Sequence, residues 1–197
     1  MHYVFNSGTL IVVNYINTGQ DTISGKDEKQ WYAIRVTYNR EMKVKQELDS
    51  LNISNFLPMK YSILSRGGNL IKVLTPAISN LIFINISKDE MREYRNKTQM
   101  PIRYIMDKET NQPIIIPKKQ MDNFIAVAGT HDEQIVYLNP TLTQIKKGER
   151  VRITGGIFEG TEGEFVRVKG DRRVVVTIQG IVAIATAFIH PSLIEKI

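Results

Sequence analysis

The chain has 197 residues, of which 42% are hydrophobic and 23% charged, and this composition excludes both wholesale disorder and a collagen-like repeat. It contains no cysteine, so disulfides, thiol catalysis and thiolate metal sites are excluded. His2, His131 and His190 are far apart and lack metal-ligand spacing, so we expect neither a zinc or iron enzyme nor a bound cofactor. The net charge of +6 suits a protein that works near nucleic acid, although a modest basic excess also serves solubility alone.

The sequence has no segment suited to a membrane or to export. Its longest apolar runs are far shorter than the ~20 residues that span a bilayer. No basic region precedes the first of these runs, as it would in a signal peptide. We therefore expect a cytoplasmic protein. Residues 1–28 join a short β-like run to a polar, turn-rich stretch, which predicts an N-terminal extension that is partly disordered.

Residues 29–137 carry the pattern of an α+β unit. β-branched and aromatic residues predict its strands, and apolar residues at every third or fourth position predict its helices. The helices are expected to begin after Asn39, at Ser87 and at Pro117. The order β-α-β-β-β-α-β-α is typical of an antiparallel sheet with helices packed on it. The predicted strands cover residues 31–37, 58–64, 70–74, 81–86 and 101–106, with a short extended run at 114–116.

A short polar linker, residues 138–145, separates this unit from a C-terminal unit in which every predicted element is a strand. Five short strands within about fifty residues imply a small barrel, because closing the sheet removes its exposed edges. We therefore expect residues 146–197 to form a five-stranded β-barrel. Its predicted strands cover residues 150–154, 164–169, 172–178, 181–185 and 193–196.

The C-terminal unit contains the pattern G-x-x-V-x-I-x-x-G-x-F-x-G-x-x-G over residues 148–163. Val151 and Ile153 alternate inward along a strand, and the glycines allow a loop to fold back on itself before the next strand begins. Phe158 stands between two glycines, where it either plugs the barrel mouth or faces a partner. This stretch closely resembles the KOW motif, which implies an SH3-like barrel.

The whole of residues 29–197 resembles the NusG family of transcription elongation factors. The first strand begins with Trp31-Tyr32, as it does in that family, and an α+β unit precedes the KOW motif across a short linker. Together with the extension at residues 1–28, the isoleucine-rich strands indicate a specialised paralogue. The chain is similar in this respect to the UpxY-type antiterminators of Bacteroidetes polysaccharide operons.

The resemblance implies that the N-terminal unit docks on the clamp helices of RNA polymerase. The run Leu81–Ile84 is apolar on both faces of its strand, so one face is expected to pack under helices and the other to stay exposed as a partner surface. Leu81 and Phe83 belong to the expected exposed face. Tyr104 and Ile115 fall where the family adds further apolar contacts with the polymerase. The alternative is a strand that its own fold covers on both sides.

The resemblance also implies two other contacts. Lys43, Lys45 and Arg66 are candidates for binding the displaced non-template DNA strand, or else they belong to a solvated surface. The partner surface of the barrel is expected at its rim. In relatives that rim recruits the termination factor Rho or a small-subunit ribosomal protein, and many of them carry an aromatic residue where this chain has Gln179. The rim residues in this sequence are Ile157, Phe158, Gln179 and Ile181.

The mechanism that follows is not enzymatic. A monomeric factor would favour the closed polymerase clamp and reduce pausing. Its barrel would recruit a partner at high local concentration, with the linker permitting either free tethering or mutual packing. The main alternative is a KOW-containing RNA- or ribosome-binding protein that never meets polymerase. An enzyme is disfavoured because no nucleophile–base pair or phosphate-binding loop stands out.

Overall fold

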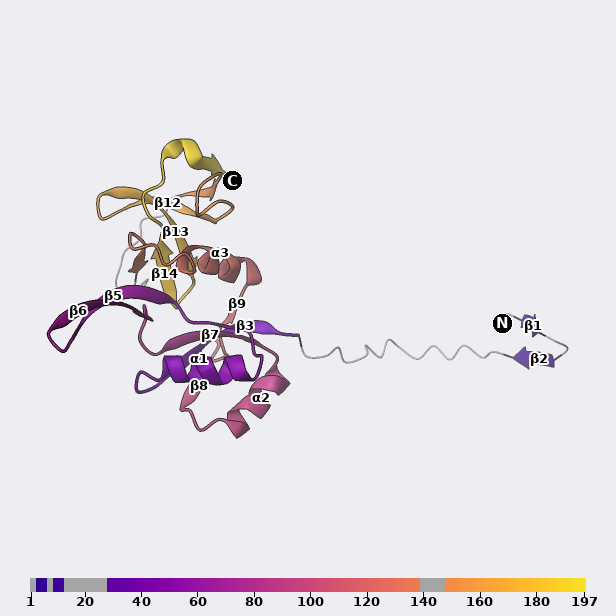
Figure 1. Cartoon of the computed structure of the whole chain (residues 1–197). Coiled ribbons are helices and arrows are strands. Elements are labelled where there is room, and N and C mark those ends of the chain that lie inside the picture. The colour runs from indigo at the N-terminus through magenta and orange to yellow at the C-terminus, as the bar shows by residue number, and fades with distance from the viewer. Residues whose placement is uncertain (1–2, 7–8, 13–27, 139–147) are drawn as a thin grey trace.

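The computed structural model describes residues 3–6, 9–12, 28–138 and 148–197 (Figure 1). In the first two ranges, strands β1 (Tyr3–Asn6) and β2 (Thr9–Val12) pair antiparallel. The predicted disorder in the N-terminal extension and almost all of the predicted linker lie outside the described residues.

The N-terminal unit is built on a five-stranded antiparallel sheet. Its central strand β3 (Gln30–Val36) pairs with β7 (Leu81–Ile86) on one side and with β8 (Ile102–Tyr104) and β9 (Ile115–Ile116) on the other. A short strand, β4 (Asn55–Phe56), which the sequence pattern did not predict, pairs with the outer side of β7. The predicted antiparallel sheet with packed helices is therefore confirmed.

Helices cover both faces of this sheet. Helix α1 (Glu41–Ser50) and helix α2 (Lys88–Lys97) bury Val44, Leu48, Met91 and Tyr94 in one core with residues of β3 and β7. Helix α3 (Lys118–Ala128) packs on the opposite face of the sheet. The predicted Ser87 cap is confirmed, since its Oγ accepts a hydrogen bond from the Glu90 N–H and the Glu90 carboxylate accepts one from the Ser87 N–H. The predicted Asn39 cap is wrong, because the helix is preceded by Arg40 and has no side-chain cap.

Strands β5 (Met59–Arg66) and β6 (Asn69–Pro76) form a separate two-stranded hairpin. Its turn is Gly67-Gly68, and both glycines have positive φ (59° and 82°), which is the backbone that a two-residue hairpin turn demands. The hairpin extends away from the body of the N-terminal unit (Figure 1).

The C-terminal unit is a six-stranded antiparallel sheet in the order β10-β14-β13-β12-β11-β15. All five predicted strands are present, while their closure into an SH3-like barrel stays a prediction. The sixth strand, β10, comes from residues 136–138 and pairs with β14, while the domain boundary predicted after residue 137 stays a prediction. A 3-10 helix, η1 (Pro191–Leu193), precedes the last strand. The strands are β10 (Val136–Leu138), β11 (Glu149–Ile153), β12 (Glu162–Val168), β13 (Asp171–Ile178), β14 (Val182–Ala185) and β15 (Ile194–Lys196).

Helix α3 lies between the two sheets, with β3 and β9 on one side and β13 and β14 on the other (Figure 1). One hydrophobic cluster runs from Phe83 in the first sheet through Phe124 in α3 to Val174 and Ile184 in the second. Of the two arrangements that the linker permitted, the structure shows mutual packing. The two units share one continuous core.

Candidate functional site

The polymerase-docking face predicted around Leu81 and Phe83 is not exposed. These side chains are 4% and 0% exposed, and the Phe83 ring lies 5.5 Å from the Phe124 ring of α3 in an edge-to-face arrangement. Strand β7 is apolar on both faces because α1 and α2 cover one face and α3 covers the other. The prediction that these two residues form an open partner surface is therefore wrong.

Tyr104 and Ile115 lie on the opposite face of the sheet from that pair. They stand directly across from Ile34 and Tyr32 in neighbouring strands, and directly paired residues in a sheet point to the same face. The Tyr104 ring packs against the Tyr32 ring with centroids 5.1 Å apart. The structure thus splits the four predicted polymerase contacts into two pairs, and Tyr104 and Ile115 share a cavity of about 830 Å³ beside α2.

The predicted nucleic-acid residues lie on two elements. Lys43 and Lys45 are on α1, and Arg66 ends β5 beside the hairpin turn. Lys45 forms an ion pair with Asp49 at 2.9 Å, and the Asp49 carboxylate also accepts a hydrogen bond from the Asn55 side chain. The hydrogen bond from Lys45, more than that from Asn55, holds the pKa of Asp49 below its ordinary value. Lys43 and Arg66 are exposed.

The four residues predicted at the rim of the C-terminal unit have different surroundings. Phe158 is 3% exposed and packs in the hydrophobic core, so its side chain does not lie open at the surface as a partner contact would. Ile157 beside it is 66% exposed. Gln179 lines a cavity of about 380 Å³ together with Ile114 and Pro117 of the N-terminal unit. Ile181 is partly buried against the shared core. The turn at Gln179 therefore faces the N-terminal unit, and Ile157 is left as the exposed apolar residue of the predicted rim.

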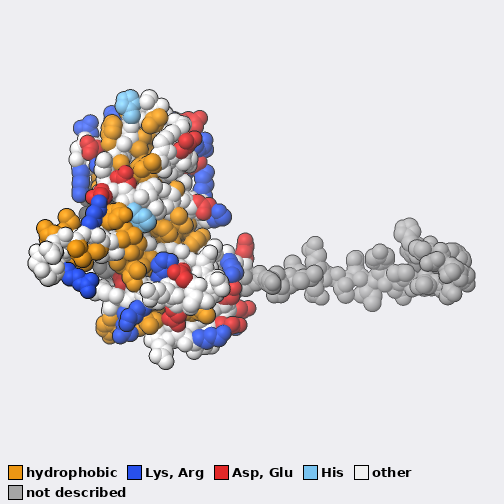
Figure 2. Space-filling view, in the orientation of Figure 1, with side chains coloured by type: hydrophobic (Ala, Val, Ile, Leu, Met, Phe, Trp, Pro, Cys, Tyr) orange, Lys and Arg blue, Asp and Glu red, His pale blue; other side chains and the backbone are white. Residues whose placement is uncertain are grey.

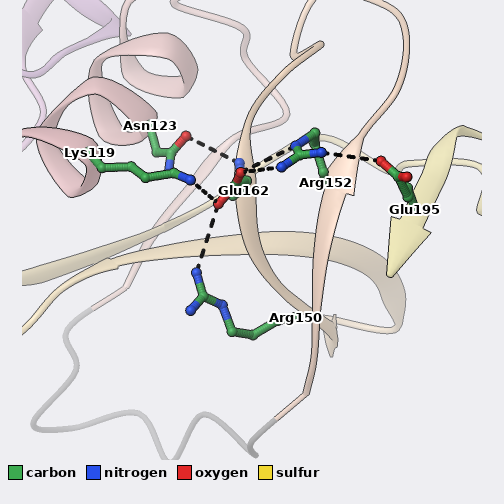
Figure 3. A network of polar contacts seen from close by, with 6 residues as sticks. All are labelled: Lys119, Asn123, Arg150, Arg152, Glu162 and Glu195. Atoms are coloured by element: carbon green, nitrogen blue, oxygen red, sulfur yellow. Dashed lines mark hydrogen bonds and ion pairs between the residues drawn. The ribbon is translucent and has the colours of Figure 1, made fainter. Parts of the chain in front are cut away.

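A polar network that the sequence analysis did not single out joins α3 to the C-terminal sheet (Figure 3). Its centre is Glu162, which is 7% exposed and forms ion pairs with Lys119 of α3 at 2.8 Å and with Arg152 at 2.9 Å. The Glu162 backbone N–H also donates to the Asn123 side-chain oxygen at 3.2 Å. The hydrogen bonds from Lys119 and Arg152 lower the pKa of Glu162. Arg152 continues the network to Glu195 at 3.4 Å.

A buried cation, Arg173, ties the C-terminal sheet to the chain that follows α3. It is 7% exposed and donates to the backbone carbonyls of Gln134 and Thr186, at 2.5 and 2.8 Å. Nearby, the Tyr137 hydroxyl donates to the Met59 carbonyl at 3.3 Å, and burial raises the pKa of Tyr137 to about 12. These contacts could not be found from the sequence, because each joins residues that are far apart in the chain or pairs a side chain with a backbone carbonyl.

The hairpin presents the other apolar surface of interest. One of its faces carries Tyr61, Ile63, Leu70 and Leu74, which are 46%, 71%, 76% and 40% exposed. Figure 2 shows hydrophobic side chains gathered over this part of the molecule. Lys72 lies on the same face, 4.5 Å from the centre of the Tyr61 ring, and forms an ion pair with Glu133. We call this set the hairpin face.

No helix in the described ranges is long and apolar enough to span a membrane. The same residues include no group of three or more histidine or acidic side chains placed to hold a metal ion.

Comparison with known proteins gives the following matches. The family model described as "Transcription termination factor nusG" matches residues 29–125. A solved structure described as "Domain interaction in Thermotoga maritima NusG" is similar with a TM-score of 0.42 and 17% sequence identity, covering 86% of this chain and 98% of that one. A likeness this distant carries no argument about activity. The search of curated proteins found no match.

Proposed function

Because the chain belongs to the NusG family, whose model matches residues 29–125, we propose that it is a transcription elongation and antitermination factor that binds RNA polymerase. The family match is the observation that carries the proposal. It covers the N-terminal unit from β3 into α3, including the hairpin. Polymerase docking on the clamp, with suppression of pausing, is therefore assigned to this unit.

The hairpin face is the surface that we assign to polymerase in place of Leu81 and Phe83. It groups four large apolar side chains on a projecting element, and a contiguous exposed apolar patch is typical of a protein-binding surface. On binding, the apolar side chains of the hairpin face would leave water and contact an apolar surface of the polymerase. These side chains are Tyr61, Ile63, Leu70 and Leu74. Leu81 and Phe83 would instead have to leave a closed core to make the same contact.

The C-terminal unit is proposed to recruit a second partner, either Rho or a small-subunit ribosomal protein. Ile157 is the apolar residue of the predicted rim that solvent reaches most freely, so it is the proposed contact. The alternative, an RNA-binding barrel, has less support. Two of the basic residues of this unit are already engaged, Arg152 with Glu162 and Arg173 with backbone carbonyls, which leaves them less available to phosphates.

The test is retention of the full chain on purified, immobilised RNA polymerase. The variant Ile63→Asp/Leu70→Asp places two carboxylates on the hairpin face, and retention is expected to fall at least tenfold. Exposed positions of this kind change folding stability by only about 0.5 kcal/mol, so the variant remains folded. Leu51→Asp, at a position 46% exposed at the end of α1, is the matched control and keeps full retention. Equal retention of both variants would refute the hairpin assignment.

A further inference from the structure

The cavity beside α2 has the size of a small-molecule site. Its volume of about 830 Å³ falls within the roughly 300–1,000 Å³ of such pockets. It is bounded by α2, by the Tyr104 end of β8 and by the segment leading into β9. Two of its lining residues, Tyr32 and Met91, are only 2% exposed and belong to the core of the first sheet. The cavity is therefore built on closely packed side chains, which hold its shape.

One wall of this cavity carries three cations. Lys88, Arg92 and Arg95 occupy positions i, i+4 and i+7 of α2, so they share a helix face and spread over about 10 Å of the helix axis. Of the described residues that line the cavity, none is acidic. Asp89 pairs with Arg92 at 3.0 Å, but both side chains are largely exposed, and exposed pairs of this kind are weak. The wall therefore suits a ligand with several negative charges close together.

The other walls offer an aromatic ring, an apolar side chain and two amides. The Tyr104 ring is partly buried and packs edge-on against Tyr32 with centroids 5.1 Å apart, while Ile115 is 49% exposed. The side-chain amides of Asn96 and Gln112 supply both donors and acceptors. These groups suit a flat ring whose face packs on Tyr104 and whose edge forms hydrogen bonds.

From this combination we propose that the cavity binds a free nucleoside di- or triphosphate as a small-molecule ligand of the chain. Its polyphosphate would lie along the cations of α2 and its base against Tyr104 and Ile115. A terminal phosphate carries close to two negative charges, so a polyphosphate concentrates charge where three cations are grouped. Inorganic phosphate would leave the ring unused, and an acidic peptide would leave both the ring and the amides unmatched. This inference goes beyond polymerase docking and does not depend on it.

The experiment is isothermal titration calorimetry of the full chain with ATP, with GTP and with inorganic triphosphate, in the absence of polymerase. One of the nucleotides is expected to bind roughly 5- to 100-fold more tightly than inorganic triphosphate, the range that stacking on an aromatic ring contributes. Tyr104→Leu is expected to remove that difference and to leave the affinity for inorganic triphosphate unchanged. Arg92→Gln/Arg95→Gln is expected to weaken all three ligands by about tenfold or more. Arg103→Gln is the control, because Arg103 is an exposed cation on the same strand as Tyr104 and points to the other face.

Several results would overturn the inference. Equal affinity for the nucleotides and for inorganic triphosphate would mean that the cations bind an anion and that the ring takes no part. Tighter binding of a polyglutamate peptide, or of an oligonucleotide without terminal phosphates, would assign the cavity to a different ligand. Absence of saturation by about 1 mM nucleotide would mean that the cavity is not a nucleotide site. Circular dichroism checks that each variant is folded, and Ile115→Ser, at a position 49% exposed, tests the same wall if Tyr104→Leu unfolds.

Discussion

Replacing Phe83 by alanine tests whether this residue is a core residue or a docking residue. The ring is fully buried between β7 and α3, and its removal leaves a cavity in the core that the two units share. Truncating a buried phenylalanine costs about 3–5 kcal/mol, which includes the edge-to-face contact with Phe124 at 5.5 Å. For a chain of this length the melting temperature is expected to fall by roughly 6–20 °C.

The assay is urea unfolding followed by tryptophan fluorescence and by far-ultraviolet circular dichroism. Trp31 is the single tryptophan, so fluorescence reports on β3 of the first sheet, while circular dichroism reports on both sheets. Because the core is continuous, the two signals are expected to change in one coincident transition, which Phe83→Ala shifts to lower urea. Ile63→Ala, at a position 71% exposed, is the control and costs less than about 0.5 kcal/mol.

Two results would refute this reasoning. A loss of less than about 1 kcal/mol in unfolding free energy for Phe83→Ala would mean that the ring is not enclosed. The docking surface predicted from the sequence requires such an exposed ring. Two separate transitions in the wild-type chain, one for each signal, would mean that the two sheets do not share a core.

Three further predictions follow from particular contacts. Ser87→Ala removes the α2 capping box and is expected to cost about 1 kcal/mol in urea unfolding, whereas Ser87→Asn retains most of the stability. Gly163→Ala places a Cβ 2.4 Å from the Val175 carbonyl oxygen and is expected to destabilise the chain strongly, while Gly155→Ala, whose nearest neighbour is a flexible Leu193 methyl at 3.3 Å, costs much less by the same measurement. The pKa of Glu162 is lowered in the folded chain, so its stabilising contribution is present above the ordinary glutamate pKa of 4.5 and is lost as the pH falls through the lowered value. Glu162→Gln is therefore expected to lower stability at pH 7 and to flatten the acid limb of a stability–pH curve, and an unchanged limb would contradict the role of the network.

The local features of the fold were predictable from the sequence because each depends on neighbouring residues. The Ser87 cap follows from a serine three positions before a glutamate, and the hairpin turn follows from Gly67-Gly68 between two β-like runs. The strands of the C-terminal sheet follow from their β-branched content. These signals need no knowledge of how distant segments pack.

The features that depend on packing were not predictable. The apolar run at Leu81 and Phe83 shows that both faces of β7 avoid water, but it does not say whether a helix of the same chain or a partner covers the second face. Helix α3 supplies that cover from about forty residues downstream. Strand β10 is three residues long, too short for a clear sequence pattern, and it is a strand because it pairs with β14. Glutamate is usually found at the protein surface, and Glu162 is buried because α3 packs against the second sheet.

The most direct test of the proposed function is a single-round transcription assay with purified RNA polymerase halted at a defined pause site. The wild-type chain is expected to shorten the pause, and Ile63→Asp/Leu70→Asp is expected to lose that effect while Leu51→Asp keeps it. A pause lifetime that stays unchanged at saturating concentrations of the wild-type chain would contradict its assignment as an elongation and antitermination factor.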